Sequence, residues 1–268
     1  MKEPFYRYFI RSGWAERIDT PATIGAKFLK TLDTLTGIDP IFATWEIFDA
    51  RNISSLPLSA ARTRMAAIVE NNVARDDFGK PVPSYQGYRA SAIAGEFKDP
   101  RGVKFRVTAG GRYENGTKLE FGEYDAPPDL NIITYPLFKA ALLTINTIWD
   151  APWACAQAFR SGAVAVPMEL GGALGSVIES VTQVPVDPTF PRTIFHIPWI
   201  AYLSAALAPG LRLSPEILSE RTPDGGLLMT ACEQRLDPGN PEHVRRARIL
   251  AETMIACTGY RPGGAMRW

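Results

Sequence analysis

Apolar and polar residues alternate at the start of the chain and then change to a helical spacing. Residues 6–18, YRYFIRSGWAERI, interleave aromatic and β-branched side chains with polar ones, which predicts a first strand. A helix is expected next, because Thr20 can cap its N-terminus, Pro21 suits its first turn and Gly37 can end it. Its apolar positions recur three and four residues apart, at Ile24, Phe28, Leu32 and Leu35.

The middle of the chain predicts a second helix and then a meander of strands. Residues 58–72 have a helical apolar side made by Leu58, Met65, Ile68 and Val69. Three strand-like segments follow at 85–95, 103–113 and 117–124, and glycine, Asp-Pro and Asn-Gly turn signals separate them. We therefore expect an antiparallel meander, closed by a helix over residues 135–150 and a further strand over 151–159.

The second half is less regular. Residues 161–190 mix glycines and prolines with a short helix candidate at Leu174–Val181, so any boundary between two lobes is expected there. A strand over 192–203, a glycine turn within 221–233 and a last helix capped by Asn240 complete the pattern. Helices and meandering strands without a regular βαβ alternation predict an α+β fold over residues 1–268, with an antiparallel meandering sheet packed by several helices.

One short stretch, IDPIFATWEIFD at residues 38–49, concentrates aromatic and acidic side chains. Phe42, Trp45 and Phe48 are spaced three apart, so we expect at least two of them in the core. Glu46 and Asp49 are then expected to face outward. On this interpretation the stretch is architectural before it is part of any interface.

Composition narrows the function classes. The 268 residues are 46% apolar with a net charge of +1, which is enough to form a core and gives no general field for nucleic acid or membrane lipid. The longest apolar run, Phe195–Leu211, is shorter than the roughly 20 residues that a bilayer needs. Charged residues interrupt the N-terminus before a signal peptide can form, and three scattered cysteines suggest reduced thiols. We expect a cytoplasmic protein without cofactor or metal.

Catalytic patterns are sparse. Neither histidine has cysteine or carboxylate at ligand spacing, and no G-x-S-x-G or phosphate-binding loop is present. The sharpest alternative is Asp76 or Asp77 followed by Glu96 and Lys98, because many metal-dependent nucleases place two Mg²⁺-binding carboxylates and a lysine in this way. The same residues are also expected in an ordinary solvated hairpin end.

Several landmarks occur in an order that resembles a known family. These are a strand with a tryptophan, a capped helix, an Asp-Pro-aromatic turn with a second tryptophan, a helix-end tryptophan before Pro-Trp, and a Gly-Gly turn. The residues are Trp14, Asp39, Pro40, Phe42, Trp45, Trp149, Pro152, Trp153, Gly225 and Gly226. The pattern resembles the immunity protein 52 family of bacterial polymorphic-toxin systems over most of the chain, apart from residues 161–190. We assign these landmarks structural roles, since tryptophans bury large areas and glycines permit tight turns.

This resemblance implies a non-enzymatic inhibitor that binds a restriction-endonuclease-like toxin of type VI secretion and neutralises it in the producing cell. An adaptor or chaperone for an effector is a third interpretation, and the state of assembly, including a homo-oligomer, stays open. A nuclease active site is a basic groove, so acidic loops with aromatic anchors are the expected contact surface. Two segments qualify, although each could also be a solvated loop: Glu120, Phe121, Glu123, Tyr124, Asp125 and Asp129 in one, and Glu70, Asp76, Asp77 and Phe78 in the other.

Overall fold

The computed structural model describes residues 5–51, 54–95, 100–112, 115–122, 126–160 and 196–258. These residues form one open, ten-stranded antiparallel sheet with the strand order β3-β2-β4-β5-β6-β1-β7-β8-β10-β9. The strands are β1 (Tyr6–Gly13), β2 (Trp45–Asp49), β3 (Ser54–Pro57), β4 (Tyr88–Ala94), β5 (Val103–Ala109), β6 (Gly116–Phe121), β7 (Trp153–Arg160), β8 (His196–Leu203), β9 (Leu218–Arg221) and β10 (Leu227–Thr230). The predicted α+β class and the antiparallel meander β4-β5-β6 are confirmed.

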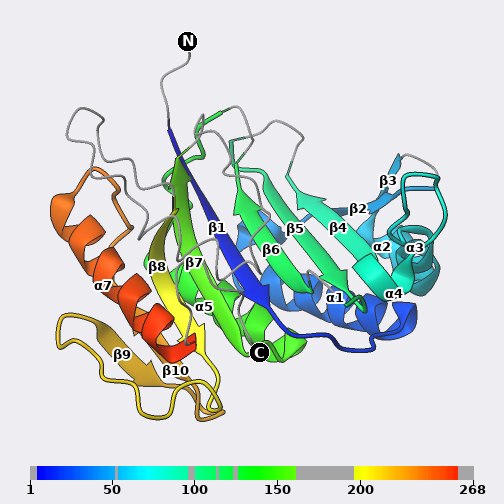
Figure 1. Ribbon diagram of the computed structural model, residues 1–268. Helices are drawn as coiled ribbons and strands as arrows, with labels where there is room; N and C mark the ends of the chain where they lie inside the picture. The colour runs from blue at the N-terminus through cyan, green and yellow to red at the C-terminus, as the bar shows by residue number, and fades with distance from the viewer. Residues whose placement is uncertain are drawn as a thin grey trace.

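Helices lie on both sides of this sheet (Figure 1). They are α1 (Pro21–Thr36), α2 (Leu58–Ala61), α3 (Met65–Asn71), α4 (Pro83–Gln86), α5 (Tyr135–Trp149) and α7 (Pro241–Thr258), with short 3₁₀ turns η1 (Pro40–Phe42) and η2 (Arg62–Arg64). In Figure 1, α1 and α5 lie behind the sheet, whereas α7 lies in front of it against β8. The helix candidate Leu174–Val181 and the lobe boundary near 161–190 fall outside the described residues.

The first helix begins and ends where the sequence indicates. The Thr20 hydroxyl accepts a hydrogen bond from the Thr23 amide at 3.2 Å, and the Gly37 amide donates to the Asp33 and Thr34 carbonyls. The predicted apolar positions Ile24, Phe28, Leu32 and Leu35 are all fully buried. Local capping and apolar spacing therefore suffice to define α1.

Removing the cap of α1 is expected to lower the free energy of unfolding by about 1 kcal/mol, as is usual for Thr→Ala at an N-cap. The variant is Thr20→Ala, measured by urea unfolding. Thr34→Ala is the matched control, because it removes an exposed hydroxyl in the last turns of the same helix, where alanine has the higher helix propensity. Equal effects of the two changes would contradict the capping role.

The landmark aromatics form contacts between helix and sheet. Trp14, which follows β1, stacks on Trp149 at the end of α5, with ring centroids 5.5 Å apart and an interplanar angle of 10°. Phe42 stacks on Trp45 at 5.9 Å, and Asp39 caps η1 by accepting from the Ile41 amide. The four aromatic side chains are buried, whereas Asp39 is partly exposed.

The glycine landmarks also have a physical reason. Gly225 has a φ of +82° in the turn between β9 and β10, a conformation that glycine adopts without strain. At Gly226 a Cβ atom would lie only 2.5 Å from the Tyr202 ring, so the close approach requires glycine. Both residues shape the β9–β10 hairpin, which agrees with their predicted structural role.

The stretch at 38–49 corrects one expectation. Phe42 and Trp45 are buried as predicted, but Asp49 is fully buried and Phe48 is 43% exposed. The reason is that residues 45–49 form strand β2, whose side chains alternate between the two faces. Trp45, Ile47 and Asp49 therefore point to the core. In a strand, residues three apart lie on opposite faces, so Trp45 and Phe48 do not share the core.

Candidate protein-binding surface

A compact loop between α3 and α4 carries the second predicted acidic segment. Short bridges pair Val73 with Tyr88 and Arg75 with Pro81, and the Val82 amide donates to the Ala74 carbonyl at 2.8 Å. The Asp76 carboxylate accepts from the Phe78 and Lys80 amides at 3.0 and 2.8 Å. The loop is therefore held by its own hydrogen bonds. We refer to residues 73–82 as the Phe78 loop.

Phe78 protrudes from this loop with 95% of its surface exposed. Asp76 and Asp77 flank it in an exposed position, and Glu70 is exposed in the helix that precedes it. The four residues predicted for this segment are thus all exposed, as are Arg75 and Lys80. The hydrogen bonds of the turn hold the Phe78 side chain in an exposed position, where it can insert into a pocket of a partner protein.

The first predicted segment is arranged differently. Phe121 is fully buried, and Glu120, on the opposite face of β6, is only 5% exposed. In this structure Phe121 therefore belongs to the core, where it stacks on Phe138, and not to an exposed surface. Glu123, Tyr124 and Asp125 lie outside the described residues.

Asp129 is involved in local contacts at the end of this segment. Its carboxylate accepts from the Asn131 amide and from the Arg101 guanidinium, each at 2.9 Å. These hydrogen bonds lower the pKa of the Asp129 carboxyl below its usual value. Asp129 therefore stays ionised and organises its own turn.

The alternative nuclease constellation is not assembled by the described residues. Asp77 is exposed on the Phe78 loop, whereas Glu96 and Lys98 lie outside the described residues. Within the described ranges, no group of three His, Cys, Asp or Glu side chains is close enough to hold a metal ion. Cys155 and Cys232 are buried free thiols there, and burial raises the pKa of the Cys155 thiol to about 12.

A second surface, which sequence reasoning missed, is the face of the sheet turned away from α1 and α5. Strand β5 directs Val103, Phe105 and Val107 into the core and Lys104 and Arg106 to the other face. Register then aligns Lys104 with Glu120 and Arg106 with Lys118, and Lys118 with Arg11 on β1. The outward positions of β1, β5 and β6 thus carry five cations, Arg7, Arg11, Lys104, Arg106 and Lys118, against the single carboxylate of Glu120.

Glu120 is the centre of these charges. Its carboxylate lies 2.6 Å from the Lys118 ammonium, 3.2 Å from the Arg7 guanidinium and 4.0 Å from that of Arg106. Burial alone would raise the pKa of the Glu120 carboxyl, but Lys118, Arg106 and Arg7 outweigh burial and lower it. Burial lowers the pKa of the Lys118 ammonium to about 8, even with Glu120 beside it. The cluster therefore carries more positive than negative charge, although Glu120 at its centre is buried.

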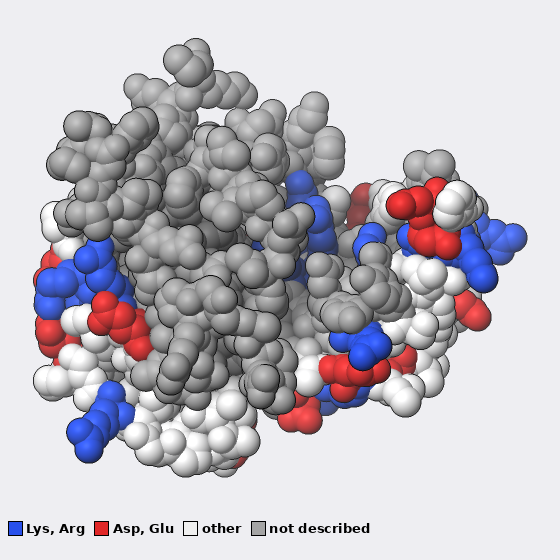
Figure 2. All heavy atoms as spheres, in the orientation of Figure 1, with Lys and Arg blue, Asp and Glu red and all other residues white. Residues whose placement is uncertain are grey.

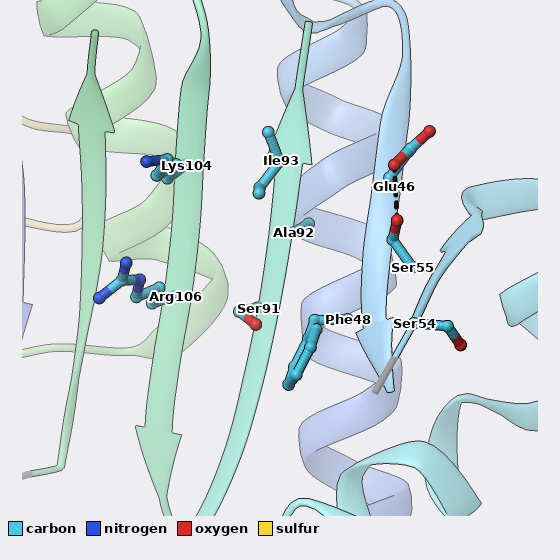
Figure 3. Close-up of a pocket in the computed structure, with 9 residues that line it drawn as sticks. All are labelled: Glu46, Phe48, Ser54, Ser55, Ser91, Ala92, Ile93, Lys104 and Arg106. Carbon is cyan, nitrogen blue, oxygen red and sulfur yellow. Dashed lines mark hydrogen bonds between the residues drawn. The ribbon is translucent and has the colours of Figure 1, made fainter. Parts of the chain in front are cut away.

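The same face is hollowed over strands β2 to β5 (Figure 3). A groove of about 370 Å³ lies there, with Phe48 and Ile93 on its apolar side and Lys104 and Arg106 on its basic side. Ser91 lies on β4, the strand next to the one that carries Phe48. Its small side chain leaves the space of the hollow unfilled. We call this feature the β2–β5 groove.

Figure 2 views the molecule from this side, and Lys and Arg atoms gather in the hollow between the grey atoms and the elements at the right. The alternation in VKFRVTA, the sequence of β5, places Lys104 and Arg106 on one face, so this pair of basic residues was predictable from the sequence. The clustering with β6 and β1 depends on strand order and register, which the sequence does not display.

Comparisons with known proteins are distant. No protein-family model matches this chain, and no curated protein sequence matches it. A solved structure of a Pseudomonas aeruginosa T6SS protein is similar with a TM-score of 0.46 and 13% sequence identity, over 95% of this chain and 72% of that chain. A likeness at this distance indicates neither an activity nor a partner. The resemblance to the immunity protein 52 family therefore stays a prediction from the sequence landmarks.

None of the helices in the described part of the chain combines the length and the apolar character needed to cross a membrane.

Proposed function

We propose that this protein is an immunity protein that binds a secreted nuclease toxin and neutralises it in the producing cell. The observation that supports this function most directly is the Phe78 loop. It presents an aromatic side chain with 95% of its surface exposed, flanked by Asp76 and Asp77, on a turn held by its own hydrogen bonds. The sequence landmarks of the immunity protein 52 family, which lie in the framework of the fold, agree with this function.

The chemistry of the loop suits a nuclease. A surface that binds nucleic acid is basic, and residues 70–82 carry Glu70, Asp76 and Asp77 against Arg75 and Lys80, so an excess of one negative charge attracts it. Phe78 supplies the apolar anchor on which tight binding depends. Because the loop is already ordered by Asp76, little conformational entropy is lost when it docks.

A plasmid-cleavage assay with Mg²⁺ tests the function. The protein is assayed alone and then with the nuclease domain encoded next to it. We expect no cleavage by the protein alone and stoichiometric suppression of cleavage by the nuclease domain. Cleavage by the protein alone would favour a nuclease that uses Asp77, Glu96 and Lys98, and a complex that still cleaves would favour an adaptor.

Phe78→Ala is expected to weaken binding to the nuclease domain at least tenfold, because the anchor is lost while the fold is untouched. Isothermal titration calorimetry measures the affinity. Ile18→Ala is the matched control, since Ile18 is an apolar residue with the same 95% exposure outside the loop. If both variants bind as the wild type does, the Phe78 loop is not the contact surface.

A further inference from the structure

Phe9 lies near the middle of the sheet, on the face turned away from α1 and α5. Its strand, β1, runs between β6 and β7 (Figure 1), and register places Glu120 and Gln157 on either side of it. Two cations lie over the Phe9 ring, because the Arg11 guanidinium is 5.2 Å and the Lys118 ammonium 5.0 Å from the ring centre. The face therefore gathers two like charges around one ring, which attracts each of them while they repel each other.

The charge of Arg11 is poorly compensated. Among the residues that the structure describes, none makes a hydrogen bond or an ion pair with the Arg11 guanidinium. Burial lowers the pKa of the Arg11 guanidinium, and the charge of Glu120, which is bonded to Lys118 at 2.6 Å, offsets this only in part. An arginine does not lose its proton in a protein. A bound anion is therefore the remaining way to compensate this charge.

The neighbouring strand contributes a buried amide. Gln157 is fully buried, and neither its Oε1 nor its Nε2 has a hydrogen-bond partner among the described residues. The register of β7 against β8 also shifts between Ala156 and Gln157, and Pro198, the residue opposite Gln157, has no N–H to donate. Such irregularities in a sheet are frequent beside functional sites. A buried polar group without a partner is destabilising, so its retention here indicates a ligand that supplies the partner.

We propose that Arg11, Lys118 and Gln157 form a binding site for a tetrahedral oxyanion, phosphate or sulfate, beside the Phe9 ring. A guanidinium binds two oxygens of such an anion side by side, and the ammonium and the amide N–H donate to the others. The outward positions of β1, β5 and β6 carry five cations against one carboxylate, which favours a doubly charged anion. The site goes beyond the proposed function and does not depend on it.

Water is the rival occupant. A buried water molecule usually makes about three hydrogen bonds, so it can satisfy the Gln157 amide. It carries no net charge, however, and leaves the repulsion between Arg11 and Lys118 in place. A doubly charged oxyanion accepts from the same donors and also compensates both cations. The two occupants are therefore distinguished by whether the protein takes up an anion.

Equilibrium dialysis of the full chain against radiolabelled sulfate, in a chloride buffer, measures this uptake. We expect one sulfate per chain. Arg11→Met and Gln157→Leu are each expected to weaken binding about tenfold or more, the usual effect of removing a hydrogen bond to a charged group. Arg212→Met and Gln234→Leu are the matched controls, because both of these residues are exposed in loops that flank β9 and β10.

Thermal unfolding gives a result that a purely structural role would not produce. In chloride, Gln157→Leu should melt at or above the wild-type temperature, because leucine fills a similar space without burying an amide. Added sulfate should raise the melting temperature of the wild type and of Gln234→Leu by more than that of Gln157→Leu. The general stabilising effect of sulfate acts on all variants alike, so the difference between them reports the site.

Several outcomes would overturn the proposal. One is a wild-type protein that takes up neither sulfate nor phosphate, and another is equal uptake by the wild type and Arg11→Met. A Gln157→Leu variant that melts well below the wild type in chloride would give the amide a structural role instead. An oligothymidylate that binds more tightly than sulfate, and less tightly to Arg11→Met, would assign the cluster to nucleic acid. None of these measurements uses the nuclease domain, so they are independent of the immunity function.

Discussion

Trp149→Ala is expected to lower the free energy of unfolding by about 3–5 kcal/mol, the usual cost of removing a large buried aromatic side chain. Trp149 is fully buried at the end of α5, where its ring stacks on Trp14. Its indole N–H donates to the Thr31 hydroxyl of α1 at 3.0 Å. One side chain therefore joins α5, α1 and the end of β1, and alanine leaves a cavity between all three.

Urea unfolding at neutral pH measures this loss. Trp149→Phe should retain most of the ring packing and lose the hydrogen bond, so about 1–2 kcal/mol is expected for it. Phe78→Ala is the control for truncation of an aromatic side chain at an exposed site, where an effect within about 0.5 kcal/mol is usual. A loss below about 1 kcal/mol in Trp149→Ala would show that this contact does not join the helices to the sheet.

Glu120→Gln is expected to lower the free energy of unfolding by about 3 kcal/mol, although the side chain keeps its shape. Removing one member of a buried ion pair leaves the remaining charge without compensation. Here Lys118, Arg7 and Arg106 would all lose their shared carboxylate. The estimate is at the lower end of the usual range because the Lys118 side chain is 28% exposed and can still reach water.

The pH dependence of this effect has a defined sign. The pKa of the Glu120 carboxyl is lowered in the folded protein, so its contribution is present above the unfolded-state pKa and is lost as the pH falls through the folded-state pKa. The difference in stability between wild type and Glu120→Gln should therefore be constant near neutral pH and shrink in acid. Glu46→Gln, at an exposed acid on the same face, should show little difference at any pH. A difference that grows in acid would contradict the ionised state of Glu120.

The local elements were predictable wherever short-range rules apply. Thr20, Pro21 and Gly37 define the ends of α1, and Asn240 accepts from the Glu242 amide at the start of α7, as its position before a proline indicated. Turn residues and alternation likewise predicted the strands of the meander. These features depend on neighbours along the chain, and their signals are therefore visible in the sequence.

The candidate contact surface was predictable only in part. Asp76, Asp77 and Phe78 could be placed on a loop because polar and turn-forming residues surround them, and the structure puts them on the surface. Glu120 and Phe121 also place an acid beside an aromatic residue, but they end strand β6 and both are buried, on opposite faces of the sheet. An acidic residue in the sequence does not reveal whether a neighbouring strand supplies its partner.

The sequence by itself determined the α+β class, the ends of α1, the start of α7 and the meander, because capping, turn chemistry and apolar spacing act within a few residues. The one helix expected over residues 58–72 is instead divided into α2, η2 and α3, and α4 was not expected. Only the tertiary structure decided that β1 lies between β6 and β7, and that β2 joins the sheet beside β4. Those pairings bring Arg7, Arg106 and Lys118 around Glu120 and create the groove between Phe48 and Arg106. Register between strands distant in sequence is set by the packing of the whole sheet, so no short stretch of the chain encodes it.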